Sequence, residues 1–331
     1  MSLFRKSLIA GSALIAASVA CVYAAFKLSP WPSVLLIRHA FDEGARVSQN
    51  SIAGLVPKDV VAQRGLRYAA GDRDALFDVY APAGVAGSLP AVVWIHGGGF
   101  ISGTRTDLSA YLQILAARGF VTIGIDYTVA PEAQFPTPIR QANTALEHII
   151  ANAARFHIDP RRIFLAGDSA GAQIAAQSAL VISDAGYAAR FGIAPGIARD
   201  SLRGLLLFCG PYDPTILNFV GPYGDFMRTV IWAYLGTRNP ADPRINQLAI
   251  PPHITPAYPP VFISVGNADP LAPQSVALAG ALRARGVEVD ALFFPADHKP
   301  PLGHEYQLLL GTEDGRLSFD RATAFLKSHA Q

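Results

Sequence analysis

The chain has 331 residues, 51% of them apolar and 16% charged, with a formal net charge of +2 at pH 7. This composition excludes a disordered chain, and so small and scattered a positive charge predicts no nucleic-acid partner. A single α/β domain of roughly 250–300 residues would use most of the length. The two cysteines, Cys21 and Cys209, are too few for a disulfide framework or a metal cluster, so we expect two buried thiols.

Residues 1–30 have the pattern of an export signal or an N-terminal membrane anchor. An uncharged stretch from residue 8 to residue 26 approaches the length that spans a bilayer, and Arg5 and Lys6 precede it. Ser-Val-Ala before Cys21 fits a cleavage site, so cleavage stays open. The alternative is a buried N-terminal helix of the domain. We expect membrane contact by this segment and a domain outside the cytoplasm, in the periplasm or envelope if the source is bacterial.

Residues 31–65 are expected to form helical turns that lead into the domain or cover part of it, and residues 66–331 to form the domain itself. In the latter, short apolar β-type runs alternate with helical stretches, which predicts an α/β fold with a mostly parallel central sheet flanked by helices. The reactive site of such a sheet lies beyond the carboxyl ends of its strands. The expected strands are 76–80, 91–95, 121–126, 163–166, 204–208, 261–265 and 289–294; the expected helices are 107–118, 138–154, 170–183, 273–285 and 316–328.

The stretch 211–260 interrupts this alternation. It is rich in Pro, Gly, Tyr and Phe, contains no clear strand, and has a helical pattern near 225–235. A connection this long inside a compact domain is usually functional. We interpret it as an inserted lid or cap that forms one wall of a substrate pocket.

Ser169 is the predicted nucleophile. It is the centre of Gly-Asp-Ser-Ala-Gly, which follows an apolar strand and precedes a helical run. Such a sharp strand-to-helix turn exposes the serine hydroxyl and needs small neighbours, which Gly167 and Gly171 provide. The backbone N–H of Ala170, at the start of the helix, can donate to a developing oxyanion. An ordinary strand-to-helix turn is the alternative.

A second motif, His96-Gly97-Gly98-Gly99-Phe100, ends another apolar strand. Consecutive glycines let backbone N–H groups approach a ligand closely. We therefore expect the amides of Gly98 and Gly99 to complete an oxyanion hole with Ala170. His96 is expected to hold the loop, and no Lys-Ser/Thr follows that would indicate a phosphate site.

These two motifs together resemble the hormone-sensitive-lipase-like branch of α/β-hydrolase esterases. The segment Asp-Tyr-Thr-Val-Ala-Pro-Glu at 126–132, followed by Phe-Pro, is similar to a further motif of that branch, with Thr-Val in place of Arg-Leu. The resemblance covers roughly residues 75–328 and leaves out the N-terminal run. It implies the α/β-hydrolase fold and hydrolysis of carboxylic esters, with short or medium acyl chains.

A serine nucleophile needs a histidine base and an orienting carboxylate, which follow it in this fold in the order acid, then histidine. Asp269 follows an apolar strand and matches the family's Asp-x-Leu pattern, with Asp213 as the alternative. His304 matches the family's His-x-aromatic pattern, and His298 is its rival. Asp168 is expected to be structural. Asp269 and His304 are thus the predicted acid and base.

The resulting hypothesis is a serine esterase that acts on a small-molecule ester through an acyl-enzyme and needs no metal or organic cofactor. Two alternatives stay open: an amidase or other acyl hydrolase on the same triad, and a non-catalytic, envelope-anchored scaffold. The natural ester and the oligomeric state are left open by the sequence.

Overall fold

A twisted eight-stranded sheet forms the centre of the computed structural model, which describes residues 3–331, with side chains from residue 11 on. The strand order is β1-β2-β4-β3-β5-β6-β7-β8; β2 runs antiparallel to both of its neighbours, and the remaining pairs are parallel. The strands are β1 (Val60–Arg67), β2 (Leu76–Pro82), β3 (Leu89–Ile95), β4 (Val121–Ile125), β5 (Ile158–Asp168), β6 (Leu202–Phe208), β7 (Val261–Val265) and β8 (Val289–Phe293). The predicted mostly parallel sheet is confirmed.

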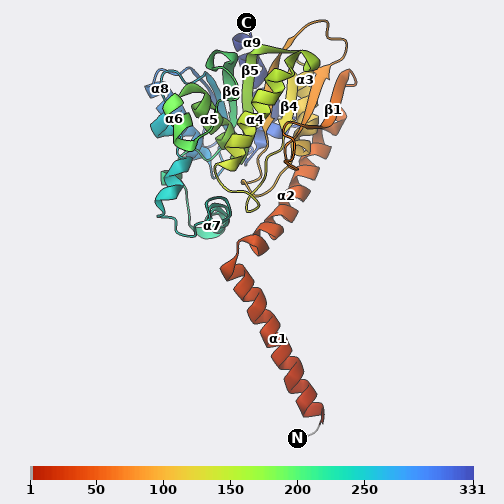
Figure 1. The fold of residues 1–331 in the computed structure, drawn as a ribbon, viewed down its shortest axis with the longest axis vertical. Coiled ribbons are helices and arrows are strands. Elements are labelled where there is room, and N and C mark those ends of the chain that lie inside the picture. The colour runs from red at the N-terminus through yellow and green to blue at the C-terminus, as the bar shows by residue number, and fades with distance from the viewer. Residues whose placement is uncertain (1–2) are drawn as a thin grey trace.

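Helices cover both faces of the sheet (Figure 1). Alternate residues of β3 show how: Val93 and Ile95 belong to one apolar core with α4 and α5, whereas Val92 and Trp94 belong to another with α3 and α9. The helices are α1 (Leu3–Leu28), α2 (Trp31–Ile52), α3 (Ser109–Ala116), α4 (Thr137–Ala151), α5 (Ser169–Ser183), α6 (Ala185–Phe191), α7 (Gly221–Leu235), α8 (Ala272–Ala284) and α9 (Glu313–His329).

The segment predicted as a lid contains α7, flanked by short 3₁₀ helices, and α7 lies beyond the carboxyl ends of the strands. There it contacts α2, so two segments far apart in the sequence form one cap. Residues 31–65 were predicted to be helical, and α2 fits this prediction. The prediction is wrong for the last residues of the segment, because residues 60–67 form β1. This edge strand pairs with β2 and stays largely exposed, and it lacks the apolar run that marks the inner strands.

The helix α1 projects away from the domain as a rod (Figure 1). Its 26 residues correspond to about 39 Å, and the window Gly11–Leu28 is apolar enough to cross a membrane and is not buried in the protein. The expectation of two buried thiols is correct for Cys209 and wrong for Cys21, which is exposed on the projecting helix α1. The side chains of Arg5 and Lys6, expected to flank a signal or anchor, lie outside the described residues.

Candidate active site

Ser169 occupies a tight turn at the junction of β5 and α5. Its φ is +48°, a left-handed value that a residue with a side chain adopts only under strong constraint. The packing around it leaves no room for larger neighbours: a Cβ on Gly171 would lie 2.0 Å from the Ile95 carbonyl oxygen, and one on Gly167 would lie 2.4 Å from the carbonyl carbon of Gly171. The local sequence thus forces the serine to the carboxyl end of the sheet.

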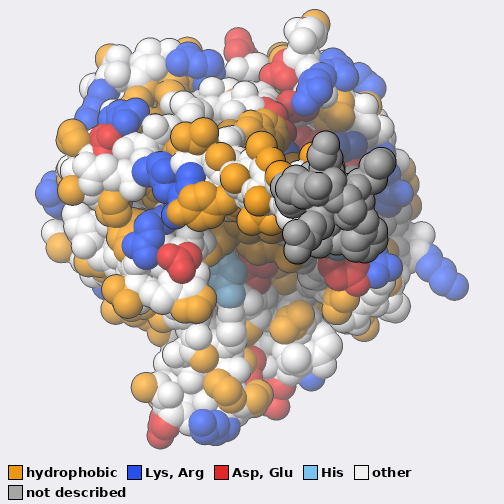
Figure 2. Space-filling model, turned by 90° about the horizontal axis from the view of Figure 1, so that it is seen from below, with side chains coloured by type: hydrophobic (Ala, Val, Ile, Leu, Met, Phe, Trp, Pro, Cys, Tyr) orange, Lys and Arg blue, Asp and Glu red, His pale blue; other side chains and the backbone are white. Residues whose placement is uncertain are grey.

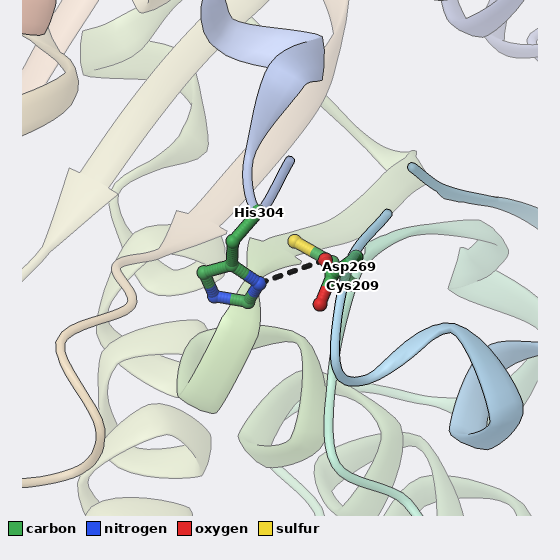
Figure 3. A group of neighbouring side chains, drawn as sticks. All are labelled: Cys209, Asp269 and His304. Carbon is green, nitrogen blue, oxygen red and sulfur yellow. Dashed lines mark hydrogen bonds and ion pairs between the residues drawn. The ribbon is translucent and has the colours of Figure 1, made fainter. Parts of the chain in front are cut away.

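His304 and Asp269 meet this serine. The His304 Nε2 atom lies 3.0 Å from Ser169 Oγ, and its Nδ1 atom lies 2.8 Å from Asp269 Oδ2. Figure 3 shows the imidazole directed at the carboxylate. With the proton on Nδ1, the ring donates to Asp269 and presents Nε2 as an acceptor to the serine hydroxyl. Residues 35 and 135 positions apart in the sequence therefore form one hydrogen-bonded chain.

The loop that carries His304 is held to the turn that carries Asp269. The Asn267 side chain accepts a hydrogen bond from Leu302 N at 2.8 Å, and the N–H of Ala268 donates to Leu302 O at 2.9 Å. Just after His304, the Tyr306 hydroxyl lies 2.7 Å from Ser264 Oγ on β7. Asp269 and His304 are therefore positioned by the same strand end.

The rival residues lie elsewhere. His298 Nε2 is 3.1 Å from Asp314 Oδ2, and its ring packs on Phe294. Asp213 caps a 3₁₀ helix by accepting from Thr215 N at 2.9 Å. Neither side chain has a hydrogen bond to Ser169 or His304 among those of the described residues, so the geometry favours His304 and Asp269.

The glycine loop lies on the other side of the serine. Gly98 and Gly99 both have positive φ (+100° and +61°), and a Cβ on Gly98 would lie 2.2 Å from the Ser102 carbonyl oxygen. Both glycines line the same cavity as Ser169 and Ala170. Ala170 lies in the first turn of α5, whose N–H groups have no acceptor within the helix. The expected oxyanion donors are thus adjacent to the serine.

Two buried side chains fix this loop. Asp168 accepts from Trp94 Nε1 at 2.7 Å and from Gly97 N at 2.9 Å. Burial, together with the nearby carboxylate of Glu305, raises the pKa of Asp168 well above its ordinary value. His96 stacks on Tyr127 with 4.3 Å between ring centroids. Both Asp168 and His96 therefore hold the loop, as the sequence predicted.

A cavity of about 450 Å³ opens over Ser169. Part of its wall comes from the cap, where Tyr223, Phe226 and Val230 of α7 and Phe41 of α2 line the cavity. The Phe41 and Phe226 rings lie 5.8 Å apart. Further α2 residues in the lining are Ala40, Gly44, Ala45 and Ser48.

Sequence reasoning missed this contribution of α2. Residues 41, 44, 45 and 48 recur at the spacing of one helix face, and that was the available signal.

Arg38 ties α2 to the loops of the site. Its guanidinium donates to Glu132 Oε1 at 2.7 Å and to the carbonyl oxygens of Ile101 and Ala130 at 2.6 and 3.0 Å. Ile101 follows the glycine loop, and Glu132 ends the 126–132 motif. Nothing in the local sequence around Arg38 indicates these partners, because they lie more than 60 positions away.

Thr128 and Val129 stand where the family motif has Arg-Leu, and Thr128 forms hydrogen bonds to nearby segments. Thr128 N donates to Gln141 Oε1 at 2.8 Å, and its hydroxyl lies 3.0 Å from Asp74 Oδ2. Thr128 therefore links its loop to α4 and to the segment before β2. It does not reach the serine.

Desolvation lowers the pKa of the His304 imidazole, whose side chain is still 37% exposed, whereas the hydrogen bond to Asp269 and the carboxylate of Glu305 raise it, and the net result is a pKa above its ordinary value. Glu305 Oε1 lies 3.7 Å from His304 Nε2. The His304 imidazole therefore binds its proton more tightly than a free histidine does. Glu305 was not singled out from the sequence; its position next to His304 was the only signal.

Cys209, at the end of β6, lies with Asp269 and His304 in a compact group (Figure 3). Cysteine, aspartate and histidine are metal-binding residue types, and their ligand atoms lie within 4.8 Å of one another. However, the contact of 2.8 Å between His304 and Asp269 is hydrogen-bond length, which is too short for two ligands on one zinc ion. The group is thus arranged as a hydrogen-bonded pair beside a thiol. Burial raises the pKa of that thiol, which keeps it protonated.

A serine on a strand-to-helix elbow, beside a histidine and an aspartate at the carboxyl edge of such a sheet, defines the class of α/β hydrolases. Comparison with known proteins agrees. A family model described as the α/β hydrolase fold matches residues 92–298. Carboxylesterase NlhH of Mycobacterium tuberculosis is 31% identical over 261 residues, which cover 76% of this chain and 77% of that protein.

Esterase LipC of the same organism is 30% identical over 241 residues, which cover 71% of this chain and 56% of LipC. Among solved structures, esterase B from Lactobacillus rhamnosis is similar in fold, with a TM-score of 0.77 and 22% identity over 89% of this chain and 97% of that one. The chain belongs to the α/β-hydrolase family, in its hormone-sensitive-lipase-like carboxylesterase branch. It is a carboxylic ester hydrolase.

Proposed function

We propose that Ser169, His304 and Asp269 are the catalytic triad of this esterase, and that the amides of Gly98, Gly99 and Ala170 form its oxyanion hole. The observation that carries the proposal is the hydrogen-bonded chain from Ser169 Oγ through both nitrogens of His304 to Asp269. Each link has the length that proton transfer needs.

The reaction follows from these contacts. His304 takes the serine proton through Nε2 as Ser169 Oγ attacks the ester carbonyl carbon, and Asp269 stabilises the resulting imidazolium. The backbone N–H groups donate to the oxyanion of the tetrahedral intermediate. His304 then protonates the alcohol as the C–O bond breaks, leaving an acyl-enzyme. Water, deprotonated by the same histidine, releases the acid and restores Ser169.

The cavity supports acyl chains of short to medium length. Its volume of about 450 Å³ falls at the lower end of the range for small-molecule sites, and its walls are mostly apolar. Amide hydrolysis on the same triad is the alternative. Comparing an ester and an anilide of the same acyl group separates the two activities.

We further propose that residues 1–30 are an export signal or membrane anchor, that residues 31–65 lead into the domain and cover it, and that residues 66–331 are the catalytic domain outside the cytoplasm. The apolar, uncovered α1 supports membrane contact. Protease accessibility of the domain in intact cells and spheroplasts of an expressing bacterium tests this location.

The nucleophile is tested by turnover of p-nitrophenyl esters of increasing chain length. The Ser169→Ala variant is expected to lose turnover by about 10⁴-fold or more. A matched control is Ser183→Ala in the last turn of the same helix, which should retain it. Turnover that persists in Ser169→Ala would contradict the assignment, and failure of the wild type to react with a fluorophosphonate would favour the scaffold alternative.

A further inference from the structure

The cavity and the apolar helix α1 lie on the same side of the molecule. The strands end at this side, and α7 and α2 cover it, while α1 projects from it (Figure 1). Only two residues separate the end of α1 at Leu28 from the start of α2 at Trp31. Phe41, which lines the cavity, is about 15 Å along α2 from Trp31. A membrane that holds α1 would therefore lie close to the mouth of the active site.

The surface at this end of the cap is apolar. Where α1 meets α2, Leu28 is 82% exposed and Leu36 is 64% exposed, with Leu35 at 57%. Just before α7, Val220 is 78% exposed. Figure 2 looks onto the face from which α1 projects and shows hydrophobic side chains gathered there beside a hollow, with Lys and Arg side chains around them. In a protein surrounded by water, so many exposed leucines at one place indicate an interaction surface.

Aromatic and basic side chains lie close to the α1–α2 junction. Arg238 donates to the Lys27 carbonyl oxygen at 2.7 Å and lies 4.5 Å from the centre of the Trp232 ring. Lys27 lies over Tyr23 at 5.5 Å, and Trp31 is 40% exposed. Tryptophan, tyrosine and basic residues are the side chains that prefer the headgroup region of a bilayer, where cations also attract anionic lipids.

We propose that the active-site mouth faces a bilayer surface. The cap rests in the headgroup region through its α1–α2 junction, and the substrate is a membrane-dissolved lipid ester that enters between α2 and α7. This inference rests on the proposed function for its substrate and on α1 for its orientation. The apolar cavity wall, from Phe41 to Phe226, would continue the apolar environment of the bilayer up to Ser169.

The contact itself is tested without catalysis. The full chain is reconstituted in vesicles of phosphatidylcholine with a minor share of phosphatidylglycerol, with and without brominated phosphatidylcholine, which quenches tryptophan fluorescence at short range. The chain has three tryptophans, and Trp94 is buried. We expect marked quenching in the wild type and a smaller quenched fraction in Trp31→Phe. Equal quenched fractions in the two proteins would overturn the membrane contact, whether or not the protein is active.

The substrate route is tested with the double variant Leu35→Glu/Leu36→Glu, whose side chains lie outside the cavity lining. The matched control is Val61→Glu, an exposed position on β1. Val61 pairs with Ala81, and the neighbouring Tyr80 pairs with Thr122 near the start of β4, so Val61 lies at the end of the sheet away from the site. In vesicles, we expect the double variant to hydrolyse a bilayer-dissolved p-nitrophenyl ester of medium chain length about tenfold more slowly than the control. Both should hydrolyse soluble p-nitrophenyl acetate at the wild-type rate.

Equal rates of the double variant and the control on the bilayer-dissolved ester would overturn the route. A change in oligomeric state alone, measured by light scattering in detergent, would assign the apolar surface to a second copy of the chain instead. Loss of both ester activities in the wild type would contradict the proposed function, and the quenching result would still decide the orientation.

Discussion

The inner strands with their turns are held by close backbone packing, whereas the cap is held by contacts between apolar side chains. Around Ser169, backbone atoms approach so closely that only glycine fits at 167 and 171, and the sequence records this requirement in a short motif. In the cap, α2 and α7 meet through apolar side chains that many residues could replace. The first region is therefore readable from local sequence. The second is defined by contacts between segments about 180 positions apart.

The largest expected effect separates the two histidines that follow the last strand. His304→Ala should lower kcat/KM by about 10⁴-fold or more, because it removes the base and the later acid. His298→Ala should stay within about threefold of wild type, because His298 contacts Asp314 and not the serine. Ester turnover with both purified variants checks this. The opposite ranking would assign the base to His298.

Glycine substitutions compare the two regions directly. Gly171→Ala places a methyl group 2.0 Å from a carbonyl oxygen and should destabilise the fold by about 3 kcal/mol or more. Gly44→Ala, inside α2, meets no atom within 4 Å and should stabilise it by about 0.5–1 kcal/mol. Urea denaturation measures both. Similar losses of stability would show that α2 is packed as tightly as the elbow.

Removing the polar link between cap and core should have an intermediate effect. Arg38→Met leaves Glu132 and two carbonyl groups without their donor and should reduce stability by about 1–3 kcal/mol. KM for esters should rise more than kcat falls, because α2 forms a wall of the cavity and does not touch the reacting atoms. Arg46→Met, whose side chain forms only an exposed pair with Glu43, is the control. A fall in kcat with unchanged KM would contradict the claim that Arg38 acts by holding α2 in place.

The smallest expected effect concerns pH. The proposed triad needs neutral His304, so activity should fall as the pH drops through the pKa of this imidazole. Because that pKa is raised in the folded protein, the acid limb of kcat/KM should lie above the ordinary histidine value of 6.5. Glu305→Gln removes a nearby negative charge, lowers the pKa of His304 and should shift the limb to lower pH. The exposed Glu147→Gln serves as the control, and an unshifted limb in Glu305→Gln would exclude Glu305 as a cause.

The features that the sequence predicted lie mainly in the inner strands and their turns, and most of those it missed depend on contacts between distant segments. The inner strands, the lid with α7 and the esterase class were predicted and are confirmed, because buried parallel strands carry continuous apolar runs and the elbow needs glycine at fixed positions. The edge strand β1 was missed, since a largely exposed strand has no such run. Arg38 and Cys209 could not be assigned roles, because their partners come from distant segments whose placement depends on the whole fold.

The central claim is that Ser169 is the nucleophile of this site. Its most direct test is reaction of the full chain with a fluorophosphonate, followed by mass spectrometry of the peptides. The account predicts one phosphonyl group per chain, located on Ser169, and its absence in His304→Ala under the same conditions. A label on another residue, or none on folded wild-type protein, would contradict it.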